Sequence, residues 1–196
     1  MKSDVYNSLF KKISDANNCV TDVSDLILNG KIISIFLSKR EVGPRALGFR
    51  SIICSGKNNN IIKSLNINKK KREQFRPLAP LIREEISDEY FYIPKKIKHN
   101  LYWMGSVVKA KQKTINEYPS CVHVDNTSRV QIIKNKHNFL YKLLENLEKN
   151  NLKIIINTSF NIAGDPIVFD YIDCYTNMKR MDLKYLVTDN GLFERL

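Results

Sequence analysis

The sequence predicts a single layered domain of the α/β or α+β class. Three observations lead to this prediction. The chain has 196 residues, a length typical of one domain with room for an inserted lobe. Hydrophobic residues make up 43% of the chain, enough to form a substantial core. Short β-branched runs alternate with segments of helical periodicity, which is the pattern of strands and helices packed in layers.

The first half of the chain contains a polar start followed by alternating helical and strand-like segments. Residues 1–24 are expected to be a lead-in, with a short helix or a loose segment over residues 1–20. Residues 22–29 place three aliphatic side chains on one face and stop at an Asn-Gly pair, which predicts a helix. The β-branched run over residues 31–37 predicts a buried strand. Further elements are expected as a short strand at 51–54, a turn at 56–60 and helical spacing at 61–71.

The second half of the chain is predicted to hold one irregular insertion between regular elements. Two prolines keep residues 75–80 out of a helix, because each disfavours helical geometry in the residue before it. Residues 93–118 show little periodicity and many lysines, so we expect an exposed inserted flap within a main domain spanning 25–196. The other elements are expected to be a strand turning into a short acidic helix over 81–91, a strand over 122–133, a helix with an apolar stripe over 139–149, a strand over 153–156, a helix over 172–179 and a strand over 184–188.

The charge balance limits the classes of partner. The formal net charge is +12, from 32 basic and 20 acidic side chains. Such a balance favours phosphorylated partners: a nucleotide, a nucleic acid or an acidic protein surface. Much of the excess is lysine in runs at 69–71 and 95–98, and such runs usually lie on solvated faces. Charge alone therefore raises the expectation of nucleic-acid binding only modestly.

The cysteines and the hydropathy indicate an intracellular setting. The chain contains no C-x-x-C pair, so a zinc knuckle is not expected. We expect reduced, buried thiols in a cytosolic compartment. The sequence shows neither a secretory leader nor a stretch of about 20 apolar residues, so we expect a cytoplasmic protein without a membrane span. The four scattered cysteines are Cys19, Cys54, Cys121 and Cys174.

One loop carries the densest chemical signal in the chain. Residues 40–51 read R-E-V-G-P-R-A-L-G-F-R-S and contain three arginines. Gly43, Pro44 and Gly48 restrict the backbone to a defined non-helical path. Guanidinium groups in such a place suit phosphate and carboxylate groups, because their fork of donors matches those oxygens. We interpret this arginine loop as a phosphate-binding loop without Walker spacing, although a tight turn with solvated arginines would have the same composition.

A second segment offers further cations. Residues 66–80 read N-I-N-K-K-K-R-E-Q-F-R-P-L-A-P. Lys70, Arg72 and Arg76 would give alternating point-charge and fork-type contacts to an anion, and Glu73 could orient one of them. A charged surface helix is the alternative interpretation of the same spacing.

A third segment follows an apolar strand and holds small polar side chains. Residues 157–168 read N-T-S-F-N-I-A-G-D-P-I-V. Such strand ends are where open α/β sheets bind ligands. Ser159 and Asn161 can donate to phosphate or carbonyl oxygens without adding bulk, unless they serve only as an N-cap and turn.

A fourth segment raises the question of a metal. Residues 123–131 read H-V-D-N-T-S-R-V-Q. No third ligand stands at a convincing spacing, so we expect a structural histidine rather than a permanent metal site. In a strand, alternation would place five polar residues on one face: His123, Asp125, Thr127, Arg129 and Gln131.

These four segments together resemble the C-terminal domain of the NodU/TobZ-type O-carbamoyltransferases. The resemblance covers roughly residues 25–190 and rests on E-V-G-P-R-A-L-G-F-R-S, K-x-R-E-x-F-R-P-L-A-P, H-V-D-x-T-S-R-V-Q and N-T-S-F-N-x-x-G-x-P-I-V, in that order. That domain is similar to the YrdC fold, so the resemblance implies a single YrdC-like domain with a twisted open mixed sheet flanked by helices. The T-S-F-N-I-A-G here looks like the T-S-A-N-x-x-G of YrdC proteins, and the Lys70-Lys71-Arg72 run looks like their K-x-R.

The resemblance implies ATP and carbamoyl phosphate as substrates. In this family the YrdC-like domain joins them into carbamoyl adenylate, releasing phosphate and pyrophosphate, with Mg²⁺ bridging triphosphate oxygens. A separate actin-like ATPase domain then passes the carbamoyl group to an acceptor hydroxyl. That domain and its metal-binding histidines have no counterpart in these residues, so a partner protein carrying it is expected, and the acceptor cannot be read here.

The resemblance also implies roles for particular side chains. Catalytic contacts to phosphates are carried over to Lys70, Arg72 and Arg129. The chemistry agrees, because anionic carbamate must approach anionic ATP, and preorganised cations offset that repulsion. No covalent nucleophile and no permanent metal site are expected. Substrate or nucleotide contacts are implied for Arg45, Arg76, His123, Asn157, Ser159 and Asn161.

Two other functions remain open from the sequence. A basic YrdC-like domain could hold RNA or nucleotide without turnover, with steeply salt-dependent RNA affinity. The chain could also be a folded but inactive remnant of a split transferase. Ser159 and Asn161 favour the enzyme over the RNA-binding module, because a phosphate-backbone groove does not require small polar residues. Two departures from the family pattern, S-G-K-N-N-N at 55–60 and S-K before Arg40, bear on transfer more than on adenylate formation.

Overall fold

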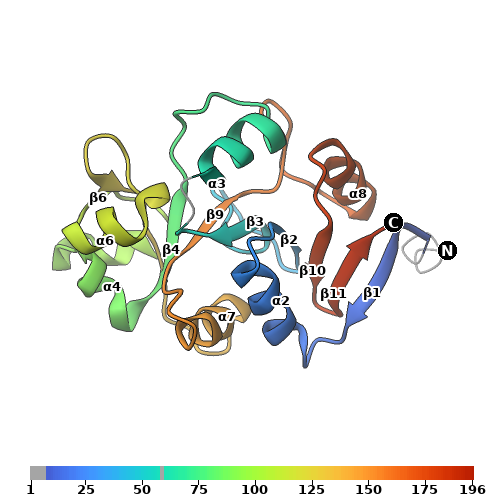
Figure 1. The fold of residues 1–196 in the computed structure, drawn as a ribbon, viewed down its shortest axis with the longest axis horizontal. Helices are drawn as coiled ribbons and strands as arrows, with labels where there is room; N and C mark the ends of the chain where they lie inside the picture. Colours follow the sequence, from blue (N-terminus) through green and yellow to red (C-terminus); the bar gives the residue numbers. More distant parts are fainter. Residues whose placement is uncertain (1–7, 58–59) are drawn as a thin grey trace.

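An eight-stranded mixed sheet forms the centre of the molecule (Figure 1). The computed structural model describes residues 8–57 and 60–196. The strands are β1 (Phe10–Ser14), β2 (Ile33–Phe36), β3 (Arg50–Ser55), β4 (Ala79–Arg83), β8 (Gln131–Ile133), β9 (Ile155–Ser159), β10 (Tyr185–Thr188) and β11 (Gly191–Arg195). Their order across the sheet is β1-β11-β10-β2-β3-β9-β4-β8. The β10–β2 and β4–β8 pairs are parallel and the other neighbours are antiparallel, which confirms the predicted open mixed sheet.

Helices lie on both sides of this sheet. In Figure 1, α2 (Cys19–Leu28) and α7 (Phe139–Glu148) lie together below it, and α3 (Asn60–Lys63) and α8 (Tyr171–Arg180) lie above it. Because both faces are covered, the central strands are apolar on both faces, as in Ile35, Ile52 and Ile53, which are all fully buried. The predicted helices at 22–29, 139–149 and 172–179 correspond to α2, α7 and α8.

A smaller sheet builds a lobe at one end of the molecule, on the left of Figure 1. It pairs β5 (Phe91–Tyr92), β6 (Val108–Ala110) and β7 (Thr127–Ser128). The short helices of the lobe are α4 (Glu84–Tyr90), η2 (Lys95–Ile97), α5 (Lys98–Leu101), α6 (Gln112–Glu117) and η3 (Pro119–Cys121). Much of the segment expected to be an exposed flap is therefore regular and packed, with Leu101, Thr114 and Tyr118 buried.

The start of the chain belongs to the main sheet. Residues 10–14 form the edge strand β1, with Phe10 opposite Arg195 of β11 and 3% exposed. The expected short helix or loose segment over 1–20 is therefore wrong for these residues, while 1–7 lie outside the described part. Three of the five residues in β1 are exposed, as suits an edge strand, and this hides the alternation that would have predicted it.

The predicted strand over 122–133 is also wrong. A turn interrupts it, closed by a hydrogen bond from His123 N to Thr127 O at 2.8 Å, with Asn126 in the left-handed region at φ 60°. Asp125 Oδ1 accepts from Thr127 N at 3.0 Å, so local Asp and Asn turn chemistry displaces strand pairing. The segment thereby contributes β7 to the small sheet and β8 to the main sheet.

The helical spacing at 61–71 appears as α3 followed by a π-helical turn, η1 (Ser64–Lys69). In this wide turn Lys70 N donates to Leu65 O at 2.7 Å, five residues back. Such turns are frequent at functional sites.

The predicted strands at 31–37, 51–54, 81–91, 153–156 and 184–188 correspond to β2, β3, β4 with α4, β9 and β10. Residues 58–59 of the predicted turn lie outside the described part. Among residues 8–57 and 60–196, no helix is long and apolar enough to cross a membrane.

Candidate anion-binding site

Lys70 is buried at the end of the π-helical turn and points at the end of β9. Its exposed fraction is only 2%. Lys70 Nζ donates to the carbonyl oxygens of Ser159 at 2.6 Å and Asn161 at 2.8 Å. It also lies 3.1 Å from Asn161 Oδ1 and 3.3 Å from Ser159 Oγ. The fold thus brings together three residues that the sequence singled out in two distant segments.

The Lys70 ammonium group has no carboxylate partner among the described residues. Burial, and secondly the positive charge of Arg72, lower the pKa of Lys70 to about 7. Burying a cation without a counter-ion costs free energy, and this cost favours the neutral amine over the ammonium group. An anion placed beside Nζ would offset that cost and restore the charged form.

Arg72 and Arg76 differ in their surroundings. Arg72 Nε donates to Asn66 Oδ1 at 2.8 Å, and its Nη2 is buried without a partner. Burial, followed by the proximity of Arg76, lowers the pKa of Arg72. Arg76 is more than half exposed and pairs with Glu73 at 2.9 Å. Arg72 therefore adds a positive charge close to Lys70, whereas Arg76 is already neutralised at the surface.

An amide network connects the end of β9 to the arginine loop. Asn157 lies two residues before Ser159 in one strand, so their side chains share a face. Asn157 Nδ2 donates to Ala46 O at 3.0 Å and to Gln131 Oε1 at 2.7 Å. Gln131 Nε2 in turn donates to Leu47 O at 3.0 Å. Asn157 Oδ1 is buried and accepts no hydrogen bond, so the network presents one free acceptor.

Glu41 holds the arginine loop in shape. Its Oε1 atom accepts from the main-chain N–H groups of Leu47 at 2.7 Å, Phe49 at 2.8 Å and Arg50 at 3.1 Å. These three hydrogen bonds join Glu41, at the start of the loop, to residues 47–50 at its end. The carboxylate thereby fixes the backbone on either side of Arg45.

Of the three loop arginines, Arg45 alone has neither a hydrogen bond, an ion pair nor an aromatic contact from its side chain within the described residues. Arg50 is buried, donates to three main-chain carbonyl oxygens, and stacks 3.6 Å from the Phe36 ring centroid. Arg40 lies 4.5 Å from the centroid of the Phe169 ring. The interpretation of the whole loop as an anion binder therefore narrows to Arg45.

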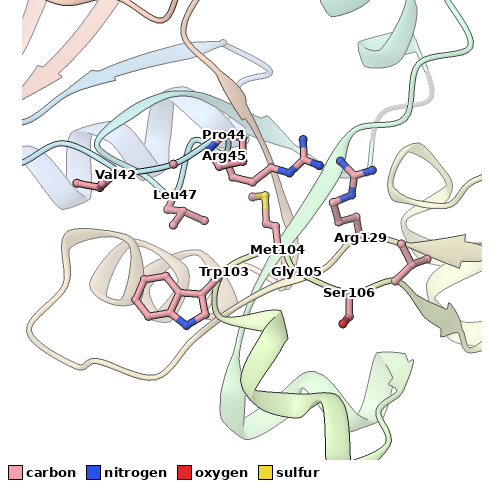
Figure 2. A pocket seen from close by; sticks show the side chains of 11 residues that line it. Val42, Pro44, Arg45, Leu47, Trp103, Met104, Gly105, Ser106 and Arg129 are labelled. Atoms are coloured by element: carbon pink, nitrogen blue, oxygen red, sulfur yellow. The ribbon is translucent and has the colours of Figure 1, made fainter.

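Arg45 and Arg129 line a cavity of about 600 Å³ between the arginine loop and residues 103–107 of the lobe (Figure 2). Figure 2 shows their two guanidinium groups beside each other, with Met104 between them and Trp103. Burial, and secondly the charge of Arg45, lower the pKa of Arg129. Two unpaired like charges on one wall form a site prepared for an anion.

His123 lies outside this arrangement. Its Nδ1 atom is 3.0 Å from Thr127 Oγ1, and burial lowers its pKa. It does not line the cavity, and the predicted shared face of residues 123–131 is absent because the turn separates His123 from Gln131. The described residues contain no cluster of three or more His, Cys, Asp or Glu side chains that could hold a metal. All four cysteines are buried and free.

The predicted site residues therefore fall into two adjoining groups and two outliers. Lys70, Arg72, Ser159 and Asn161 form one group, Arg45 and Arg129 form the other, and Asn157 links them through Gln131. Arg76 and His123 are the outliers. Sequence reasoning missed Glu41 and Gln131 as parts of the site, although both stand inside the motifs, and it missed Trp103, for which no sequence signal exists.

Solved structures with the same architecture define the class of this domain. Full-length HypF in a phosphate- and nucleotide-bound form matches 93% of this chain and 22% of its own, with a TM-score of 0.61 and 18% identity. Sua5 of P. abyssi complexed with L-threonine matches 92% of this chain and 48% of its own, with a TM-score of 0.61 and 17% identity. At these identities the likeness shows the fold alone: the chain has a YrdC/Sua5-like fold.

Sequence relatives define the family. Residues 24–195 match the family described as Carbamoyltransferase C-terminus, and the chain belongs to it. Nodulation protein NolO of Bradyrhizobium diazoefficiens is 34% identical over 177 residues, covering 89% of this chain and 32% of NolO. The 3'-hydroxymethylcephem-O-carbamoyltransferase of Streptomyces clavuligerus is 26% identical over 176 residues, covering 89% and 32%. The resemblance inferred from the motifs is confirmed, and the chain spans about a third of the length of these curated relatives.

Proposed function

We propose that this chain binds ATP and carbamoyl phosphate and forms carbamoyl adenylate, as one part of a carbamoyltransferase. The observation that carries the proposal is the buried Lys70 ammonium group, held 2.6 Å from Ser159 O with no carboxylate beside it among the described residues. Its partners within the fold are neutral oxygen atoms of Ser159 and Asn161, so its positive charge is not neutralised by them. A lysine held in this way is suited to receive an anion.

The proposed chemistry explains why several cations are needed. Water first hydrolyses carbamoyl phosphate to carbamate and phosphate. A carbamate oxygen then attacks the α-phosphorus of ATP, and the bond from that phosphorus to the leaving pyrophosphate breaks. Both reactants are anions, so fixed positive charge must offset their repulsion in the transition state.

Each group of residues has a part in this proposal. Arg45 and Arg129, the unpaired pair on the cavity wall, would bind phosphates in a bidentate manner. Lys70 and Arg72 would stabilise charge at the end of β9. Asn157 Oδ1, the free acceptor, would receive a hydrogen bond from the carbamoyl NH₂ group.

The remaining predicted contacts have smaller proposed parts. Ser159 and Asn161 accept hydrogen bonds from Lys70, and the Ser159 hydroxyl group donates to Asn161 Oδ1 at 2.6 Å, so their proposed part is to position Lys70 beside the substrate. Arg76, which is paired with Glu73 at the surface, is given no direct contact in this proposal, and His123 would act only through the turn that leads to Arg129.

Magnesium would enter with the nucleotide. The described residues offer no three-ligand group of acidic, histidine or cysteine side chains, and Mg²⁺ commonly keeps waters and binds substrate phosphates instead. The ion would neutralise part of the triphosphate charge, while the side chains of this chain hold and orient the phosphates.

Transfer of the carbamoyl group is proposed to require a further domain or a partner subunit. The curated relatives are about three times as long as the matched region, because that region covers 32% of NolO. Recognition of the acceptor hydroxyl would belong to that other part.

Release of pyrophosphate from ATP in the presence of carbamoyl phosphate tests the proposal. We expect the purified chain, alone or with a candidate transfer subunit, to release pyrophosphate only when carbamoyl phosphate is present. Lys70→Ala and Arg129→Ala should reduce the rate to background. Lys142→Ala removes an equal charge from the exposed face of α7 and should leave the rate unchanged.

Two results would count against the proposal. Absence of carbamoyl-phosphate-dependent pyrophosphate release, both alone and with candidate subunits, would remove the catalytic claim. Retained nucleotide binding without turnover would favour a non-catalytic binding module.

A further inference from the structure

The cavity beside Arg45 has two chemically different walls (Figure 2). One wall carries the guanidinium groups of Arg45 and Arg129. The opposite region carries Trp103 and Val42, which are 59% and 105% exposed. Large exposed apolar side chains next to unpaired cations call for a ligand that has both an anionic and a flat apolar part.

The loop that carries Trp103 is firmly built. Trp103 N donates to Asn100 O at 3.1 Å, and Gly105 N donates to the same oxygen at 2.8 Å. Met104, between them, is 6% exposed and adopts a left-handed backbone conformation at φ 54°. Leu101 is fully buried at the base of the loop. The indole is therefore presented to solvent by an ordered turn, although its neighbours on both sides are packed.

The anchoring extends into the lobe. Tyr102, the residue before Trp103, donates from its hydroxyl group to Glu84 Oε1 at 2.8 Å. Lys134 Nζ lies 4.5 Å from the centroid of the Tyr102 ring. The two adjacent aromatic residues therefore differ in their contacts: Tyr102 holds the loop through its hydrogen bond to Glu84, whereas Trp103 lines the cavity.

Carbamoyl phosphate alone cannot use the apolar part of this cavity. It is small and polar throughout, while the cavity measures about 600 Å³, within the range that holds a ligand of nucleotide size. A nucleotide has phosphates for the arginine pair and a purine ring that stacks on an indole.

We propose that Trp103 is the stacking wall for the purine base of the bound nucleotide, while Arg45 and Arg129 hold its phosphates. This inference rests on the proposed function and adds the residue that would select a nucleotide over a simple phosphate. Trp103 touches no reacting atom in this arrangement; it is a binding residue for the base.

The chain offers a direct probe of this contact, because Trp103 is its only tryptophan. Titration with ATP should quench the tryptophan fluorescence, since the base would stack on the indole. Titration with inorganic triphosphate should bind at the arginine pair without that quenching. Both titrations use the intact chain and require no turnover.

Substitutions of Trp103 and of a control residue distinguish loss of base stacking from a general loss of folding. Trp103→Ala should weaken ATP binding by about tenfold or more in calorimetry, the order expected for loss of base stacking, and leave the affinity for inorganic triphosphate unchanged. Trp103→Phe should recover much of the loss. Tyr92→Ala is the matched control, because Tyr92 is 60% exposed on the same lobe and does not line the cavity.

The outcomes distinguish this inference from the proposed function. If wild-type chain binds ATP and Trp103→Ala, with an unchanged melting temperature, binds it equally well, the base subsite is elsewhere and only this inference is overturned. If Trp103→Ala instead loses association with a transfer subunit while keeping its ATP affinity, the inference is likewise overturned. If wild-type chain binds no ATP, both the inference and the proposed function fail.

Discussion

The Nζ atom of Lys70 lies 2.6 Å from the carbonyl oxygen of Ser159, although 89 residues separate the two in the chain. The contact joins a π-helical turn to the end of a central strand, and it places a buried positive charge where the strand ends. From Ser159 the same face of β9 continues to Asn157, whose amide reaches the loop of Arg45 and the strand of Gln131. The end of β9 thereby contacts Lys70 through Ser159 and the backbone of the arginine loop through Asn157.

Anion binding should take up a proton at slightly alkaline pH. Burial lowers the pKa of Lys70 to about 7, so at pH 8 most free chains carry a neutral amine there. A bound anion favours the charged form and raises that pKa, so binding should draw a proton from the buffer and weaken as the pH rises above about 7. Calorimetry with ATP in two buffers of different ionisation enthalpy measures this uptake.

The matched variant for this experiment is Lys70→Met, which keeps an unbranched stem and removes the amine. It should bind more weakly at pH 7 and show no proton uptake. Equal apparent enthalpies in both buffers for the wild-type chain would contradict the assignment of this lysine to the binding site.

The same lysine should affect folding stability between pH 7 and 8.5. Because the folded-state pKa is depressed below 10.5, the unfolded chain binds more protons in this window. The cost of the buried charge is complete below about pH 7 and is progressively relieved as the pH rises toward 10.5, so stability should increase with pH. Relative to Lys70→Met, the free energy of unfolding should rise by up to about 1.4 kcal/mol per pH unit. Urea titrations at pH 7.0 and 8.5 measure it; parallel pH dependence in the two proteins would argue against a depressed pKa.

Removal of either cavity arginine should weaken phosphate binding without loss of stability. Arg45 and Arg129 lie close enough that repulsion adds to burial in lowering the pKa of Arg129. Arg45→Ala or Arg129→Ala should therefore reduce the affinity for inorganic triphosphate by about tenfold or more, because a charge-assisted contact is lost. The melting temperature should stay the same or rise as the repulsion is relieved.

The exposed pair of Arg180 with Asp165 supplies the control for these arginines. Arg180→Ala should leave the affinity unchanged, because that contact lies at the surface and outside the cavity lining. A normal affinity in both cavity variants would show that the pair does not bind the phosphates.

Glu41 should act as a positioning residue for Arg45. In Glu41→Ala three main-chain N–H groups of the arginine loop lose their acceptor, at a cost of about 1–3 kcal/mol for a part-buried cluster. We expect a lower melting temperature and a weaker affinity for inorganic triphosphate, although Glu41 itself would repel that anion. Glu41→Gln keeps an acceptor oxygen and should recover part of both losses. If Glu41→Ala binds the anion more tightly, charge and not loop shape is the main effect of this carboxylate.

Gly48 should be far less tolerant of a side chain than Gly43. An added Cβ at Gly48 would lie 2.2 Å from Leu140 Cδ1, and the backbone there has φ +109°. Leu140 is 1% exposed in α7, so Gly48→Ala should cost about 1–3 kcal/mol through overpacking and backbone strain. Gly43 also has positive φ but meets nothing within 4 Å, so Gly43→Ala should cost less. Urea denaturation of the two variants compares them, and equal losses would show that contact with the helix is unimportant.

The central strands could be predicted from the sequence because burial on both faces leaves continuous β-branched runs, as at Ile33, Ile35 and Ile53. The edge strand β1 escaped prediction for the opposite reason, because three of its five residues are exposed. The turn at His123 was missed because alternating polar residues fit a strand, while the hydrogen bonds of Asp125 favour a turn.

The residue types that the structure brings together in the candidate site could be predicted from the sequence, but the contacts of each side chain could not. Motif order indicated Lys70, Arg129 and Ser159, but it could not show that Arg50 is used to hold carbonyl oxygens within the fold. The connection of Asn157 with Gln131 and the cavity at Trp103 depend on segments far apart in sequence, so only the three-dimensional arrangement shows them.

A crystal structure of the chain with carbamoyl phosphate and a non-hydrolysable ATP analogue would test the central claim most directly. The account predicts phosphate density in contact with both Arg45 and Arg129, and a second anionic group within reach of Lys70 Nζ near Ser159. Ligands bound on another face, with Lys70 and Arg129 left without contacts, would contradict it.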